Sequence, residues 1–194
     1  EEETYKESLF GRLADLHERV LAVKVDGATK EELAWGFRVG FLTYAAKGMS
    51  EAQYGALEKK SMGAIRSSIS NANRMAQSLI LKALGDEDYE AEKKRTYETL
   101  EARYLKVKEL VAAREAAQGG GASPLTSLPF NSGYFMTFKC EVDAEELRKR
   151  LLENYGIGTI AIRNEYLRVA FSSVALEHLE ELYETIYKAA GELK

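Results

Sequence analysis

The sequence predicts an α/β protein made of two parts that a long helix connects. Apolar, β-branched runs and two helical segments fill residues 20–84, and residues 86–115 carry one uninterrupted helical periodicity. Residues 133–194 then alternate strand-like and helix-like segments. This order of elements is typical of a sheet followed by a connecting helix and a smaller α+β part.

Two strands are expected near the start, VLAVKV at 20–25 and FRVGFLTYA at 37–45. The turn at Asp26–Gly27 closes the first of them. Only about eleven residues separate the two runs, which is short for a parallel crossover, so we expect antiparallel neighbours. Both runs are apolar at consecutive positions, which predicts a sheet covered on both faces.

Two helices are expected after these strands. Ser50–Gln53 has the S-x-x-Q form of a capping box and predicts a helix that runs to about Ser68. A second helix is expected from about Asn71 to Leu84, with Gly85 as its stop signal.

One long amphipathic helix is expected over 86–115, because apolar residues recur there at mostly three- and four-residue steps without Pro or Gly. The triple glycine at 119–121 predicts a flexible joint after it. We therefore expect three divisions, with boundaries at residues 1–88, 89–121 and 122–194.

The last division is expected to be a compact α+β unit. Strands are predicted at GYFMTFKCEV, GTIAI and YLRVAF. Asp143 and Glu146 form a capping box that predicts a helix after the first strand, and a final helix is expected from about Ser173.

Composition limits the possible functions. With 194 residues, 45% of them hydrophobic, the chain can bury a core, and its net charge of -4 provides no basic field for nucleic acid or an anionic membrane. No apolar stretch approaches the roughly 20 residues of a membrane span, and the first residues are acidic, unlike a signal peptide. The single cysteine, Cys140, excludes an internal disulfide and favours a reducing compartment, so we expect a cytoplasmic protein.

Three basic residues are the candidates for chemistry. Lys30 follows the turn after the first strand, where a desolvated lysine has a lowered pKa and a nucleophilic amine, although an exposed turn lysine is the commoner case. Arg38 falls within the second predicted strand, where a guanidinium calls for a carboxylate or phosphate partner. Arg168, in YLRVAF, either points to solvent from a sheet edge or faces an acid group in a cleft. Together they indicate a small anionic ligand.

Other conspicuous residues point to structural roles. His17 and His178 fall in segments expected to be helical, without a partner at metal-ligand spacing. Cys140 is expected to be a small core residue rather than a reactive thiol. Trp35 lies between Lys30 and Arg38, where it could border a bound ligand, but we expect it to pack against the sheet.

Three segments in order resemble the class I and II aminotransferases of fold type I, which depend on pyridoxal phosphate. DGATKEELAWGFRVGF resembles the family's cofactor-lysine region, in which an arginine follows the lysine by eight residues. SGYFMTFKCEV resembles its small-domain strand, and EYLRVAFSSVALEHLEELYETI is similar to the segment that carries the substrate-carboxylate arginine. The resemblance covers nearly the whole chain and implies the end of the large-domain sheet, the interdomain helix and the small domain of that fold.

The resemblance also implies roles for single residues. Lys30 would hold pyridoxal 5'-phosphate covalently and move a proton between the substrate's α-carbon and the cofactor's C4′. Arg38, with Thr29 beside Lys30, would bind the phosphate, and Arg168 would bind the carboxylate of an amino acid or 2-oxo acid. Ser70 and Asn71 lie where the family often approaches a partner subunit's site, although a turn or helix-start role is at least as plausible for them.

Two departures from the family pattern qualify these expectations. The family commonly has a serine or threonine three residues before the lysine, where this chain has Gly27. The family's upstream half, which supplies the phosphate loop, the ring-stacking aromatic and the aspartate at the pyridine nitrogen, has no match in the 29 residues before Lys30. We therefore expect a C-terminal half that makes no complete active site alone, with a homodimer as the full-length protein.

The same fold leaves alternative functions open. It also hosts carbon–sulfur lyases and decarboxylases, and some transcription regulators use an aminotransferase-like domain as a ligand sensor. No basic recognition element for nucleic acid is evident in the sequence.

Overall fold

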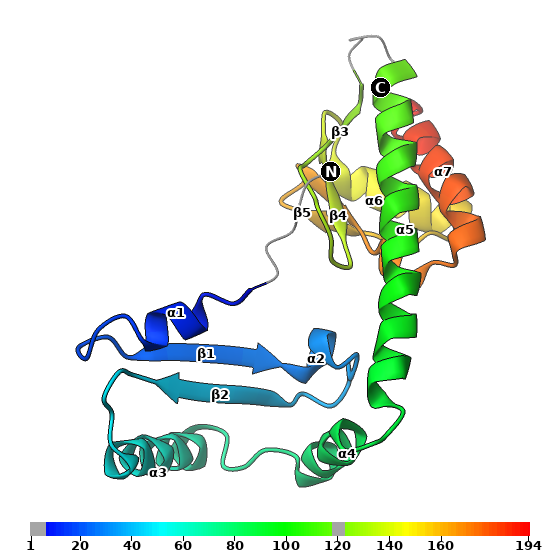
Figure 1. Cartoon of the computed structure of the whole chain (residues 1–194). Coiled ribbons are helices and arrows are strands. Elements are labelled where there is room, and N and C mark those ends of the chain that lie inside the picture. The colour runs from blue at the N-terminus through cyan, green and yellow to red at the C-terminus, as the bar shows by residue number, and fades with distance from the viewer. Residues whose placement is uncertain (1–6, 118–122) are drawn as a thin grey trace. The chain divides into compact units, whose positions relative to one another are not determined.

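The computed structural model describes residues 7–117 and 123–194, which form two compact units (Figure 1). We call Tyr5–Lys93 the N-terminal unit and Lys94–Lys194 the C-terminal unit. The predicted triple-glycine joint lies outside the described residues.

The N-terminal unit consists of a two-stranded ribbon and helices of 4 to 18 residues. Its elements are α1 (Phe10–Ala14), β1 (Ala22–Gly27), α2 (Ala28–Glu31), β2 (Gly40–Ala45), α3 (Glu51–Ser68) and α4 (Arg74–Leu84). The strands pair antiparallel, in register from Ala22 opposite Ala45 to Gly27 opposite Gly40. The predicted antiparallel neighbours are thus confirmed.

The second strand begins later than the sequence predicted. Arg38 has a φ of 54°, in the left-handed region that a continuous β-strand does not use, so β2 starts at Gly40. The expectation that Arg38 lies within a strand is therefore wrong: it lies in the loop that leads into β2. A run of apolar residues does not show that one residue within it, here Arg38, adopts a left-handed backbone conformation.

The prediction of two covered sheet faces is also wrong for the described residues. Val25, opposite Leu42, is 78% exposed, and Leu42 is exposed as well. Helix α3 reaches the ribbon where the hydroxyls of Tyr44 and Ser61 are 2.8 Å apart. Apolar strands indicate where a covering layer is required, but the described helices leave these side chains open.

The caps of α3 and α4 explain where these helices begin. Ser50 and Gln53 form the predicted capping box: the Ser50 hydroxyl accepts the Gln53 N–H, and Gln53 Oε1 accepts the Ser50 N–H at 2.8 Å. Helix α4 starts at Arg74, not near Asn71, because Asn73 is its cap and accepts the Ala76 N–H at 3.2 Å.

Helix α5 spans Tyr89–Ala117 and confirms the long helix that the periodicity predicted. The C-terminal unit continues with β3 (Leu125–Ser127), β4 (Met136–Cys140), α6 (Ala144–Tyr155), β5 (Ile160–Ile162), β6 (Tyr166–Val169) and α7 (Leu179–Gly191). The strands form one antiparallel sheet in the order β3-β4-β6-β5.

The start of the final helix differs from the sequence expectation, whereas the start of α6 agrees with it. The final helix begins at Leu179 rather than near Ser173, because the short 3-10 helices Phe171–Ser173 and Leu176–His178 precede it. Asp143 caps α6 as expected, with its Oδ1 accepting the N–H groups of both Glu145 and Glu146.

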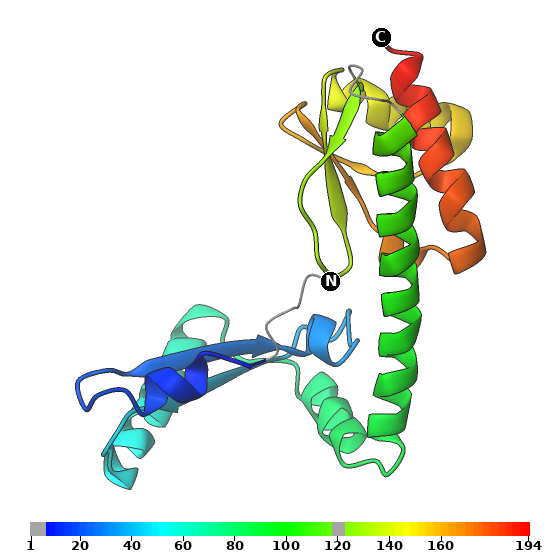
Figure 2. The ribbon, with the colours of Figure 1, turned by 45° about the horizontal axis from the view of Figure 1, so that its top comes forward.

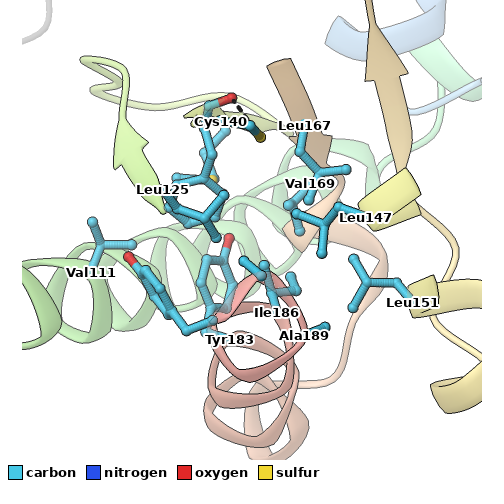
Figure 3. Close-up of a cluster of buried hydrophobic side chains, with 14 of the residues drawn as sticks. Val111, Leu125, Cys140, Leu147, Leu151, Leu167, Val169, Tyr183, Ile186 and Ala189 are labelled. Carbon is cyan, nitrogen blue, oxygen red and sulfur yellow. Dashed lines mark hydrogen bonds between the residues drawn. The ribbon is translucent and has the colours of Figure 1, made fainter. Parts of the chain in front are cut away.

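The core of the C-terminal unit lies between one face of the sheet and helices α5, α6 and α7 (Figures 1 and 2). Val111 of α5, Leu147 of α6 and Ile186 of α7 converge there with Leu167 and Val169 of β6, as Figure 3 shows. Burial alternates along the strands, so side chains between the core positions face the other way. None of the helices in the described ranges is long and apolar enough to cross a membrane.

Cys140 belongs to this core, as the sequence predicted. It is 9% exposed, its Sγ lies 3.9 Å from the Phe138 carbonyl oxygen, and burial raises the pKa of the thiol to about 11. Because the thiolate is the reactive form, we expect Ellman's reagent at pH 8 to leave the folded chain unlabelled and to label one thiol in guanidinium. Labelling of the folded chain at the rate of a small free thiol would contradict this assignment.

Candidate functional site

Lys30 lies where β1 passes into α2. Gly27 ends the strand and is the N-cap of the helix, which places Lys30 within that single turn. Lys30 is exposed, as the commoner case of a turn lysine at the surface predicts, and is not buried by this chain.

Thr29 and Arg38 meet beside Lys30. Arg38 Nη1 donates to Thr29 Oγ1 at 3.5 Å. Within residues 7–117 and 123–194, Arg38 forms no ion pair with an acidic side chain. A hydroxyl and a guanidinium this close together are two donors that one anion can share.

Backbone hydrogen bonds fix the loop that carries Arg38. The Ala28 N–H donates to the Val39 carbonyl oxygen, and the Ala34 N–H donates to the Ala28 carbonyl oxygen, each at 3.0 Å. Ala28 is fully buried under this loop. Two non-glycine residues, Leu33 and Arg38, adopt positive φ within it, so the loop returns sharply toward Thr29.

An ion pair supports the loop from the start of α5. Lys93 Nζ lies 3.3 Å from both carboxylate oxygens of Glu32 and donates to the Tyr89 hydroxyl at 2.9 Å. The Glu32 side chain is largely buried. The sequence analysis did not identify this cluster, because 61 residues separate Glu32 from Lys93 and no local pattern connects them.

Arg168 lies on β6, an interior strand between β4 and β5, as the predicted apolar strand implied. A sheet-edge position is thereby excluded. Its neighbours Leu167 and Val169 are buried in the core, so Arg168 faces away from it. Its guanidinium carbon lies 4.7 Å from the centroid of the Phe135 ring, a contact that the sequence did not reveal.

Several other expectations concern residues near these candidates. Trp35 is 76% exposed, so the expected packing against the sheet is wrong; the loop turns its ring outward. His17 lies in an exposed turn after α1, where its Nδ1 accepts the Arg19 N–H, rather than in a helix. His178 is exposed at the N-cap of α7.

Ser70 and Asn71 lie in a turn, one of the roles that the sequence left at least as plausible for them as an approach to a partner subunit's site. Ser70 has a φ of 68° and accepts from Arg66, and Asn71 Oδ1 accepts the Ala72 N–H. Throughout the part of the chain that the structure describes, no cluster of three or more His, Cys, Asp or Glu residues could hold a metal ion.

Comparisons with known proteins relate this arrangement to one family. The chain matches the family model "Aminotransferase class I and II" over residues 2–186. A search of curated protein sequences gives no match. Many solved structures do match.

Three of these structures illustrate the similarity. An aminotransferase from Anaerococcus prevotii has a TM-score of 0.68 at 21% identity, over 91% of this chain and 40% of that chain. The alpha-aminoadipate aminotransferase from Thermus thermophilus, solved with N-(5'-phosphopyridoxyl)-L-leucine, has a TM-score of 0.68 at 18% identity, over 98% and 47%. An Escherichia coli aminotransferase has a TM-score of 0.63 at 16% identity, over 97% of this chain and 46% of that chain.

The structural similarity is one of fold, and this chain spans less than half the length of each of these three proteins. It matches them in the α/β architecture predicted from the sequence, the C-terminal part of the transferase fold. The family model extends over nearly all of the 194 residues. The chain therefore belongs to the class I and II aminotransferase family.

Proposed function

We propose that the full-length protein is a pyridoxal phosphate-dependent aminotransferase, which exchanges an amino group between an amino acid and a 2-oxo acid. The observation that carries this proposal is the juxtaposition of Thr29 Oγ1 and Arg38 Nη1 immediately beside Lys30. An exposed lysine can form a covalent bond with an aldehyde, and the neighbouring hydroxyl and guanidinium can together bind a phosphate. This combination suits a cofactor that has both an aldehyde and a phosphate.

The residues of the N-terminal unit fit this cofactor. Thr29 and Arg38 would donate to its phosphate oxygens, and the Lys30 amine would hold it covalently. Bound pyridoxal phosphate supplies an electron sink for the charge that develops at the substrate's α-carbon. Lys30, once its amine is released, would remove the proton at that α-carbon and deliver it to the cofactor's C4′.

Arg168 of the C-terminal unit would bind the substrate carboxylate. Its guanidinium has no ion pair or hydrogen bond to the protein among the described residues, so its in-plane N–H groups are available to both oxygens of a carboxylate. This role requires a planar anion that every amino acid and 2-oxo acid carries. It therefore supports the substrate class without specifying the side chain.

The activity is proposed for the full-length protein because this chain covers 40–47% of the three aminotransferases above. The open apolar side chains of β1 and β2 are consistent with further layers of such a fold. We propose that the 194-residue chain alone is inactive, and that the full-length protein works as a homodimer.

Transfer of labelled nitrogen tests the reaction type. The full-length protein is incubated with pyridoxal phosphate, a mixture of 15N-labelled amino acids and 2-oxoglutarate, and the products are identified by mass spectrometry. Appearance of 15N-glutamate supports an aminotransferase. Release of ammonia with thiol, or of carbon dioxide, would indicate a lyase or decarboxylase, and no turnover with retained ligand binding would indicate a sensor.

Gly27→Ser is expected to strengthen cofactor binding. A Cβ at Gly27 meets no atom within 4 Å, and the residue has a φ of -135°, so serine fits without strain. Its hydroxyl would add a donor to a charged phosphate, which corresponds to about tenfold tighter binding. Gly27→Ala is the matched control, because it fills the same space without a hydroxyl. Equal pyridoxal phosphate affinities of the two variants, measured by absorbance titration, would contradict the prediction.

A further inference from the structure

On the outward face of the C-terminal sheet, no acidic side chain among the described residues pairs with Arg168, and Lys139, on the same face of β4, carries the same charge as Arg168. Arg168 lies opposite Thr137 of β4 on one side and opposite Ile160 of β5 on the other. In the described ranges its guanidinium has no ion pair and no hydrogen bond to a protein group. A long side chain without such partners loses considerable rotamer freedom when it must hold one orientation.

Phe135 supplies the contact that restrains it. Two residues before Thr137, Phe135 lies on the same face of the sheet and diagonal to Arg168, which is within reach of an aromatic ring. The guanidinium carbon lies 4.7 Å from the ring centroid, inside the range of a cation–π contact. Phe135 is 37% exposed and does not belong to the buried core cluster.

The two interactions of Arg168 use different parts of its guanidinium. An aromatic ring contacts the flat face, whereas a carboxylate binds bidentately to the N–H groups at the edge. Ring contact and carboxylate binding are therefore compatible, and a ring 4.7 Å from the guanidinium carbon limits the orientations that the donors can take. A preoriented guanidinium loses less freedom when its ligand binds.

We infer that Phe135 is a positioning residue, which holds Arg168 in the orientation that binds the substrate carboxylate. This inference rests on the function proposed above for Arg168. It predicts that Phe135 affects ligands with a carboxylate and leaves uncharged analogues unaffected.

The test compares 3-phenylpropanoate with 3-phenylpropanamide, by calorimetric titration of the full-length protein loaded with pyridoxal phosphate. Phe135→Leu, which keeps bulk but removes the ring, is expected to weaken binding of the acid about 3- to 10-fold. Binding of the amide should not change in Phe135→Leu. Phe135→Tyr, which keeps an aromatic ring, should bind the acid as tightly as the wild type. Ile162→Ala is the matched control: it lies on the same face, is 39% exposed, and pairs with Tyr166 rather than Arg168.

The outcomes separate the inference from the proposed function. If the wild-type protein does not prefer the acid, or Arg168→Ala leaves the preference intact, the proposed role of Arg168 fails. If Arg168→Ala removes the preference but Phe135→Leu retains it, the positioning role alone fails. In Arg168→Ala, the additional Phe135→Leu change should have no further effect on acid binding.

A second measurement tests the contact between Phe135 and Arg168 without any ligand. In the 194-residue chain labelled with 15N, the Phe135 ring should displace the Arg168 Nε–H proton resonance from its free-arginine position. Phe135→Leu should return the resonance to that position, whereas Ile162→Ala should not. An Arg168 resonance that is the same in wild type and Phe135→Leu would overturn the inference.

Discussion

Lys30→Ala is expected to reduce amino transfer by the full-length protein at least about 10³-fold, because general acid–base catalysis alone contributes 10²–10⁴-fold. The variant also loses the amine that would hold the cofactor. Single-turnover absorbance with an amino acid measures the rate. Retention of more than a tenth of the wild-type rate would contradict the role of Lys30.

Covalent attachment can be located by peptide mapping. Reduction of the loaded protein with borohydride should leave a pyridoxyl group on Lys30, which blocks tryptic cleavage there. Trypsin would then release residues 25–38 as one peptide instead of 25–30. Lys24→Arg is the matched control, because arginine can keep the ion pair to Asp26, which lies 2.9 Å away, and the adduct should remain on Lys30.

Phe138→Ala is expected to lower the free energy of unfolding of the C-terminal unit by about 3–5 kcal/mol. Phe138 is fully buried and packs edge-on against Tyr187, with ring centroids 5.4 Å apart, and against Tyr183 at 6.2 Å. Truncation would remove both ring contacts and leave a cavity between β4 and α7. The expected loss is a large share of the free energy of unfolding of a typical domain, which is about 5–15 kcal/mol.

Hydrogen exchange of the β4 and β6 amides, combined with guanidinium unfolding followed by circular dichroism, measures this loss in the correct unit. Leu152→Ala is the control, since Leu152 is 50% exposed on α6 and its truncation should cost within about 0.5 kcal/mol. A loss below about 1 kcal/mol for Phe138→Ala would show that β4 does not contribute to the core as described.

The elements that could be predicted from sequence are those whose signals are local. The capping box at Ser50, the periodicity of α5 and the short separation of β1 and β2 each depend on neighbouring residues, and each is confirmed. Helix starts were less predictable when several polar residues competed. Helix α4 begins at Arg74 with Asn73 as its cap, although Asn71 lies only two residues before that cap.

The site depends more on contacts between distant residues. Lys30 and Arg38 were identified from their type and spacing, but the contact with Thr29 requires a loop with two positive-φ residues that the sequence does not mark. The Glu32–Lys93 pair and the stacking of Phe135 on Arg168 depend on tertiary packing. The sequence pattern thus identified candidate charged residues, whereas the residues that contact them could be identified only from the three-dimensional structure.

The outward-facing indole of Trp35 has a practical consequence. It is the only tryptophan in the chain, five residues from Lys30 and exposed to solvent. Its fluorescence therefore reports on the loop between Lys30 and Arg38, and the pyridoxyl group proposed for Lys30 would absorb in the range where tryptophan emits. Quenching of that emission would measure the proposed attachment of the cofactor without an added label.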